Sequence, residues 1–248
     1  WNDQKLKSRK GVLFWKGDKK YYLPRDYYFW INFLPIIDKV KRKTDLPDIH
    51  DAQYHMSLYE VIGELFYLHG IILKKRQFGS SFYHGAKLVN VLWFEYGPVL
   101  KIGSSLSAYV TGVNGTWKMI NEYKNFLNQH TAWYRPMNPG GVGEWQQKIE
   151  YVENGRKTER GRKGVLQALS FEQSDTAGVG GLCTLFFYEE AGIAKSMDKT
   201  YEFMLPALQA GEITTGYFIG SGTVGDLKQC EPLRKYMYKA KGNGFYEV

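Results

Sequence analysis

The stretch "GIILKKRQFGSSFYHG", Gly70 to Gly85, decides how the rest of this sequence is interpreted. Its apolar start, Ile71 to Leu73, is typical of a short buried strand, and the residues from Ser81 onward are typical of a helix. Gly79 lets the backbone approach an anion, and amides at the start of the next helix can point at phosphate oxygens. The strict nucleotide-binding pattern places a lysine directly after the last glycine, where this chain has Ser80. The stretch is therefore either a phosphate loop whose lysine lies upstream or an ordinary charged strand-turn-helix.

If it is a phosphate loop, three upstream side chains could neutralise the β- and γ-phosphates: Lys74, Lys75 or Arg76. Ser81 would offer its hydroxyl to Mg²⁺. The candidate nucleotide-binding residues of the loop are Lys74, Lys75, Arg76, Gln77, Phe78, Gly79, Ser80 and Ser81.

Two further apolar runs end in polar residues. In "LFFYEEAG", Leu185 to Gly192, the carboxylates Glu189 and Glu190 follow a run typical of a buried strand. An NTPase needs one carboxylate near its hydrated Mg²⁺ and a neighbour that orients the attacking water. The alternative is a pair of solvated carboxylates at a helix N-terminus. "IGSGT", Ile219 to Thr223, brings a hydroxyl to the end of another strand, or is a simple glycine-rich turn.

Strand and helix patterns alternate along the chain, which predicts an α/β fold with a mostly parallel central sheet. In such sheets ligands bind at the carboxyl ends of strands, where the three polar loops would converge. The joint occurrence of these loops favours an NTP-hydrolysing enzyme. The other expected elements are helices over 48–69, 81–94, from about 107, over 116–129 and over 196–210, strands over 99–102, 165–171 and 214–220, a Pro/Gly loop over 134–145, and a hairpin or exposed loop over 148–163.

The composition bounds the class of protein. The chain has 248 residues, 44% of them hydrophobic, enough for one large domain with or without a small appendage. No apolar run approaches the ~20 residues of a membrane span. Cys183 and Cys230 provide neither a disulfide framework nor metal-ligand spacing, which suits a reducing compartment. The net charge of +8 favours a polyanionic partner such as nucleic acid, or a solvated basic surface.

Residues 1–47 form a separate basic and aromatic segment that closes with "KVKRKTDLPD". The charge run followed by Pro47 indicates a boundary, with the main domain over 48–248. The aromatic cluster from Tyr21 to Pro35 either stacks on nucleic-acid bases or packs this segment against its neighbour.

At these motifs the sequence resembles the ATPase domain of the large terminase subunit of tailed phages, a DNA-packaging motor. The resemblance covers roughly residues 48–248, and the whole chain if residues 1–47 correspond to the lid region of that family. Some members carry the lysine at the beginning of the phosphate loop, which matches Lys74. The acidic run resembles the Walker B segment, which gives Glu189 the metal role and Glu190 the catalytic role. Gly220, Ser221, Gly222 and Thr223 resemble the family's coupling motif.

Two further features of the family map onto this chain less directly. "DAQYHM", Asp51 to Met56, is similar to the adenine-recognising Q motif, with Gln53 as the base-binding candidate or as a helix-surface residue. Some members carry an arginine shortly before Walker B, where this chain has Val179-Gly180. An activating, catalytic arginine would then be Arg160 or Arg162, reaching into the site of a neighbouring copy, unless both are surface charge.

The resemblance implies an ASCE-type P-loop NTPase with a small N-terminal lid-like subdomain, and ATP and Mg²⁺ as cofactors. It implies a motor that moves double-stranded DNA into a procapsid without sequence preference, in the cytoplasm of a host cell. The implied protein partners are the portal protein and the small terminase subunit, and the chain would form a ring of identical copies or stay a monomer as an isolated domain. Since the sequence ends at Val248, we expect no nuclease domain and no DNA cleavage. The alternatives are a helicase-like P-loop translocase and a non-hydrolysing DNA-binding or assembly module.

Overall fold

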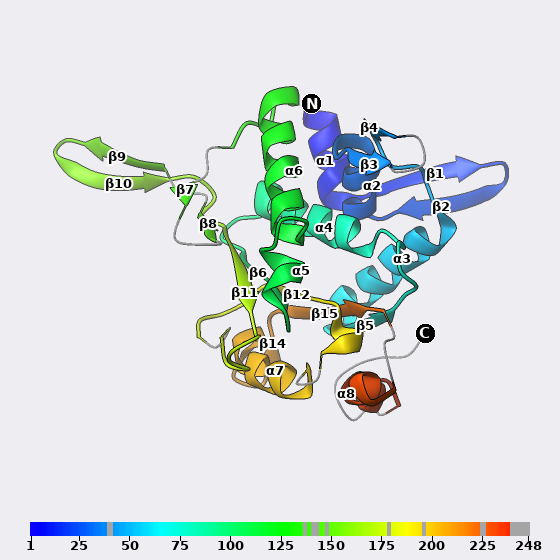
Figure 1. The fold of residues 1–248 in the computed structure, drawn as a ribbon. Coiled ribbons are helices and arrows are strands. Elements are labelled where there is room, and N and C mark those ends of the chain that lie inside the picture. The colour runs from blue at the N-terminus through cyan, green and yellow to red at the C-terminus, as the bar shows by residue number, and fades with distance from the viewer. Residues whose placement is uncertain are drawn as a thin grey trace.

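The computed structural model describes residues 1–38, 42–135, 138–139, 144–146, 149–177, 180–194, 197–223 and 227–238. Its central sheet has seven strands in the order β5-β15-β12-β6-β11-β8-β7 (Figure 1). The first five strands run parallel to one another, the short strand β8 is antiparallel to β11, and the short edge strand β7 is antiparallel to β8. The predicted α/β fold with a mostly parallel sheet is confirmed. The bounds are β5 Gly70–Leu73, β15 Tyr217–Gly222, β12 Leu185–Glu189, β6 Val99–Ser104, β11 Val165–Ser170, β8 Glu144–Gln146 and β7 Asn138–Pro139.

The central strands are apolar along their whole length because both faces of the sheet are covered. Every residue of β12 and β15 is buried, as expected for strands of a parallel sheet. Successive side chains of a strand point to opposite faces. Phe187 of β12 and Ile219 of β15 therefore belong to one hydrophobic core, and Phe186, Tyr188 and Phe218 belong to the other.

Helices form the layers on the two faces of this sheet (Figure 1). The core that contains Phe187 is completed mainly by α4, whose side chains are buried along almost its whole length, and by α6. The second core is completed by α7 and α8. The bounds are α3 Asp51–Phe66, α4 Ser80–Phe94, α5 Ser107–Val110, α6 Thr116–His130, α7 Met197–Met204 and α8 Leu227–Tyr238.

Most of the expected elements occur near their predicted positions, with two differences. The helix expected over 196–210 ends at Met204 and continues as a 3-10 turn, Leu205–Leu208, because Pro206 cannot donate the next helical hydrogen bond. The segment 134–145, expected to be loop, contributes the edge strand β7 and the start of β8. The hairpin alternative for 148–163 is confirmed by β9 Ile149–Glu153 and β10 Arg156–Arg160.

The N-terminal segment consists of α1 Asn2–Lys10, the β1–β2 hairpin (Val12–Lys16 and Lys19–Leu23), α2 Arg25–Phe33, and the β3–β4 hairpin (Ile36–Asp38 and Lys43–Asp45). Tyr27, Phe29 and Trp30 of α2 are buried. Trp30 contacts Tyr83 of α4 at 5.8 Å between ring centroids, and Phe29 contacts Phe94 at 5.7 Å. The cluster therefore serves as packing between α2 and α4, and the domain boundary near residue 47 stays a prediction.

Two features of the composition can be located among the described residues. Cys183 and Cys230 are both buried, and neither forms a disulfide. No described helix combines the length and the apolar character that crossing a bilayer requires.

Candidate active site

Three loops meet at the carboxyl ends of neighbouring strands. In the sheet, Glu189 of β12 is paired with Ser221 of β15, and Gly222 of β15 is paired with Leu73 of β5. The phosphate-loop candidate continues this pairing, because the Lys74 amide donates to the Gly222 carbonyl at 3.1 Å. The strand order thus places the loop after β5, the acidic pair and the glycine-rich strand end at one edge of the sheet.

Lys74 is the basic residue of the loop that contacts the acidic pair. Its Nζ lies 2.9 Å from Glu190 Oε1, and its side chain is 7% exposed. Lys75 and Arg76 are exposed. Among the three cations that the sequence offered for the phosphates, the structure therefore brings Lys74 to the carboxylate expected to be catalytic.

The second oxygen of Glu190 is held by the strand end of β15. Glu190 Oε2 accepts hydrogen bonds from both the amide and the hydroxyl of Thr223, each at 3.1 Å. Burial on its own would raise the pKa of Glu190, but the Lys74 ammonium and the Thr223 donors bring that pKa below its ordinary value. Glu190 is therefore an ionised carboxylate with three donors around it.

The backbone at Glu190 is unusual. Its φ of 54° lies in the left-handed region, which costs a side-chain-bearing residue about 1–2 kcal/mol. The turn is supported from β15, where Gly222 leaves no room for a side chain: a Cβ there would lie 2.4 Å from the Gly192 amide nitrogen. The glycine-rich strand end is thus packed directly against the turn that presents Glu190.

Glu189, the carboxylate expected to bind the metal, is buried and hydrogen-bonded. It is 3% exposed, and Ser81 donates its hydroxyl to Glu189 Oε1 at 2.6 Å. Burial raises the pKa of Glu189, since the charged form is poorly solvated. A hydroxyl and a carboxylate oxygen fit Mg²⁺, which takes oxygen ligands and keeps several waters. In the described part of the chain no group of three or more His, Cys, Asp or Glu residues could hold a metal.

Thr116 is a site residue that sequence reasoning missed. It is the first residue of α6, is 4% exposed, and donates its hydroxyl to Glu189 Oε2 at 3.0 Å. Both oxygens of Glu189 are therefore oriented, one by the phosphate loop and one by α6. The sequence carries a helix-start signal at this threonine but nothing that points to a carboxylate 73 residues away.

Ser80, which stands where the strict pattern has lysine, faces the protein interior. It is 2% exposed, and its hydroxyl lies 2.6 Å from Ser221 Oγ and 3.0 Å from His84 Nδ1. His84 in turn contacts Glu60 through Nε2 at 2.6 Å. The Ser80 side chain links the phosphate loop to β15, which leaves its backbone amide as the group available to an anion.

Gln53 lies against the same loop. It is 8% exposed and donates from Nε2 to the carbonyl of Phe78 at 2.8 Å. Gly79 has a φ of 82°, and a Cβ there would lie 2.8 Å from this Gln53 nitrogen. In this arrangement Gln53 supports the loop, and its role in recognising adenine stays a prediction.

The two candidate arginines lie away from these loops. Arg162 donates from Nη1 to the carbonyl of Phe94 at 2.6 Å, at the C-terminal end of α4. The helix has 15 residues, so that end is about 21 Å from the phosphate loop at 1.5 Å per residue. Arg162 therefore does not reach the acidic pair of its own chain. Arg160 is on β10, and its side chain lies outside the described residues.

A cavity of about 980 Å³ adjoins the acidic pair. Ser81 and Glu190 line it together with apolar side chains of the N-terminal segment and of two helices, including Ile37, Phe82 and Phe126. Its size and its mixed lining suit a nucleotide-sized ligand with a polar and an apolar end.

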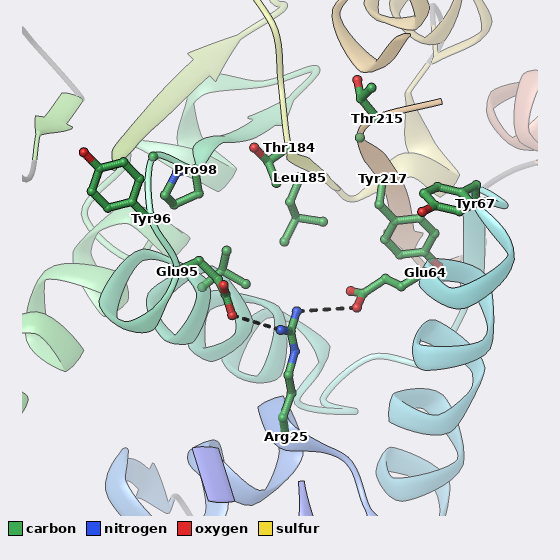
Figure 2. A pocket seen from close by; sticks show the side chains of 13 residues that line it. Arg25, Glu64, Tyr67, Glu95, Tyr96, Pro98, Thr184, Leu185, Thr215 and Tyr217 are labelled. Carbon is green, nitrogen blue, oxygen red and sulfur yellow. Dashed lines mark hydrogen bonds and ion pairs between the residues drawn. The ribbon is translucent and has the colours of Figure 1, made fainter. Parts of the chain in front are cut away.

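A second cavity, of about 390 Å³, lies at the opposite edge of the sheet, where β6, β12 and β15 begin. Figure 2 shows Arg25 between Glu95 and Glu64, with Nη1–Oε1 and Nη2–Oε2 distances of 3.3 and 3.5 Å. Because Arg25 is paired with Glu95 and Glu64, this cavity offers no uncompensated positive charge to a phosphate.

Comparison with known proteins places the fold. No protein-family model matches the chain, and no curated protein matches its sequence. The crystal structure of the bacteriophage HK97 large terminase matches 88% of this chain with a TM-score of 0.60 and 13% identity. A mutant of the Thermus phage P74-26 large terminase ATPase domain matches 73% with a TM-score of 0.50 and 10% identity. The matches cover 41% and 67% of those chains, so this chain spans less than half the length of the HK97 protein. This chain therefore has the fold of these terminase structures.

Proposed function

We propose that this chain is the ATP-hydrolysing motor domain of a tailed-phage large terminase subunit, which drives double-stranded DNA into a procapsid. The observation that carries the proposal is the pair of contacts Lys74–Glu190 and Ser81–Glu189, at 2.9 and 2.6 Å. These contacts unite a cation, a hydroxyl and two carboxylates at the end of a parallel sheet. The likeness of fold supports the same conclusion.

The loop and the adjoining cavity would hold the nucleotide. Lys74 and the amides at the start of α4 would bind the β- and γ-phosphates. Ser81 and Glu189 would hold Mg²⁺, with Thr116 keeping Glu189 in place. When bound, the ion neutralises charge on the phosphate oxygens. The base and ribose would extend from the phosphates either into the cavity beyond Ser81, against Phe82 and Phe126, or toward Gln53.

Glu190 would act on the attacking water. Its carboxylate orients the water and accepts its proton while the water oxygen bonds to the γ-phosphorus and the bond to the β-phosphate oxygen breaks. The products are ADP and phosphate. The low pKa of Glu190 keeps this group ionised before the reaction.

The strand end of β15 would couple hydrolysis to movement. Thr223 binds Glu190, Gly222 packs on the turn behind it, and Ser221 binds Ser80 of the phosphate loop. Loss of the γ-phosphate would change the hydrogen-bond partners of Glu190 and Thr223. It would therefore change the contacts of residues 220–223.

The partners follow from the resemblance and are proposed with it. DNA contact would be made to the backbone without sequence preference, and the chain would assemble into a ring with the portal protein and the small terminase subunit in the host cytoplasm. An arginine from a neighbouring copy would complete the site, since such a residue can contribute ~10³-fold or more in rate.

The test is Glu190→Gln, measured as ATP turnover and as binding of a fluorescent ATP analogue with Mg²⁺. We expect turnover to be lost while binding is retained, because the substitution keeps the shape and removes the proton acceptor. Glu202→Gln, at an exposed position of α7, is the matched control and should leave both unchanged. Unchanged turnover in Glu190→Gln, or no ATP binding by the unmodified chain, would contradict the proposal.

A further inference from the structure

Four cations gather at the C-terminal end of α4, away from the candidate active site. Lys5 and Arg9 belong to α1, Arg135 follows α6, and Arg162 follows β10. We call these four side chains the basic cluster. In the described part of the chain none of them takes part in an ion pair.

Contacts around Phe94 bring the three segments together. The ring of Trp133, two residues before Arg135, lies 5.0 Å from Phe94 and 5.2 Å from Trp1. Lys5 is one helical turn beyond Trp1, and its amide donates to the Trp1 carbonyl at 2.9 Å. Arg162 donates to the Phe94 carbonyl. Figure 1 shows α1 beside the C-terminal end of α6.

The positive charges of the basic cluster repel one another and are not compensated by ion pairs among the described residues. Burial and the neighbouring Arg162, Arg135 and Arg9 lower the pKa of Lys5, and burial and Arg162 lower the pKa of Arg135. The Nε atoms of Arg135 and Arg162 are buried and have no hydrogen-bond partner. An anion bound at this cluster would reduce the repulsion among the four cations.

We propose that the basic cluster binds backbone phosphates of duplex DNA; the choice of DNA rests on the proposed function. Four cations from three segments match several adjacent phosphates, whereas a single γ-phosphate of a neighbouring copy needs one guanidinium. The sequence around Lys5 and Arg9 is also positively charged. Residues 1–20 hold seven lysines and arginines and two aspartates, which gives them +5 of the chain's net +8.

In the proposed DNA-packaging function, α4 would link the basic cluster to the phosphate loop. The phosphate loop is at one end of α4 and the cluster is at the other, about 21 Å away. Almost every side chain of α4 is buried, so the helix is held along its length. In the proposed motor, α4 would therefore connect the phosphate loop to the DNA contact.

The experiment measures binding of a labelled duplex to the 248-residue chain by fluorescence anisotropy over a range of KCl concentrations. The test variants are Arg135→Gln/Arg162→Gln and Lys5→Gln/Arg9→Gln, and the control is Lys199→Gln/Lys235→Gln. The control removes the same charge from exposed positions of α7 and α8. Each lost phosphate contact lowers the slope of log K against log salt by about 0.9, so each test variant should lose about 1.8. The control should keep the slope of the unmodified chain.

Several outcomes overturn the proposal: equal slopes in test and control variants, no duplex binding by the unmodified chain, or full competition by inorganic phosphate at constant ionic strength. Loss of DNA-free ATP turnover in the test variants would also overturn it, in favour of an arginine acting on nucleotide. Thermal melts identify unfolded variants, and Arg9→Gln alone, which changes an exposed side chain, tests the same contact if a pair of substitutions does not fold. Binding of the ATP analogue, measured without DNA, separates failure of this inference from failure of the proposed function.

Discussion

Lys74 and Lys75 are adjacent lysines whose surroundings differ, and replacing each with alanine tests the site. The Lys74 ammonium lies 2.9 Å from Glu190 and its side chain is 7% exposed, whereas Lys75 is exposed. A charge-assisted hydrogen bond contributes about 1.5–3 kcal/mol, so Lys74→Ala should weaken MgATP binding about 10- to 150-fold. Turnover should fall at least as far, because the lost contact is with the phosphates. Lys75→Ala should change both by less than about twofold, since exposed substitutions stay within ±0.5 kcal/mol.

The same pair makes a prediction without nucleotide. Lys74→Ala leaves Glu190 partly buried beside two Thr223 donors but without its cation. The pKa of Glu190 should rise toward its ordinary value, because its largest favourable interaction is with Lys74. The difference in unfolding free energy between the unmodified chain and Lys74→Ala should therefore shrink as the pH falls and Glu190 becomes protonated.

Nucleotide titration by fluorescence and urea unfolding at several pH values check these expectations. The reasoning is refuted if Lys74→Ala binds MgATP as the unmodified chain does, or if Lys75→Ala loses as much affinity as Lys74→Ala. Equal effects of the two would mean that net positive charge, and not the placed ammonium, attracts the phosphates.

Three further predictions concern side chains around the site and the core. Thr116→Val should raise the Mg²⁺ concentration needed for half-maximal turnover about fivefold, the equivalent of ~1 kcal/mol, because Glu189 loses one donor, and Thr116→Ser should restore it. Ser80→Ala and Ser221→Ala should each lower the unfolding free energy in urea by about 1–3 kcal/mol, with the double variant losing less than the sum; additive losses would show that the two hydroxyls do not interact. Burial lowers the pKa of His69 to about 4, while the unfolded chain takes up that proton near pH 6.5, so stability should fall as pH drops from about 6.5 to 4, by at most ~3 kcal/mol. His69→Gln should flatten this part of the urea-derived stability profile, and an unchanged profile would assign the acid sensitivity to other groups.

The elements around the site could be predicted because their causes are local. Phe186 to Tyr188 form an apolar run that ends at two carboxylates, and a strand ending at Glu189 is what the structure shows. The glycine before Ser80 indicated a strand-turn-helix, and Gly79 does take the left-handed conformation that begins α4. These signals lie within a few residues of the feature they predict.

The partners of the site residues could not be predicted, because they depend on which strands are neighbours. Ser80 and Ser221 are 141 residues apart, and their hydroxyls meet because β15 lies between β5 and β12. The sequence left three cations as alternatives for the phosphates, and the contact with Glu190 distinguishes Lys74. α4 separates Arg162 from the loops of its own chain, so its expected catalytic role in the site of a neighbouring copy stays a prediction.

The contacts of Glu190 imply an order of events for the proposed reaction. Without nucleotide, Lys74 and Thr223 supply the three donors that lower the pKa of Glu190, which makes it a weak base. A γ-phosphate that takes Lys74 removes the largest of these interactions, so the pKa of Glu190 rises toward the range in which a carboxylate accepts a proton from water more readily. Substrate binding would therefore strengthen the base that activates the attacking water. When phosphate leaves, Lys74 would again pair with Glu190, and the hydrogen bonds between Glu190 and Thr223 would return to their starting state. Each turnover would therefore change the contacts of the strand end of β15 once.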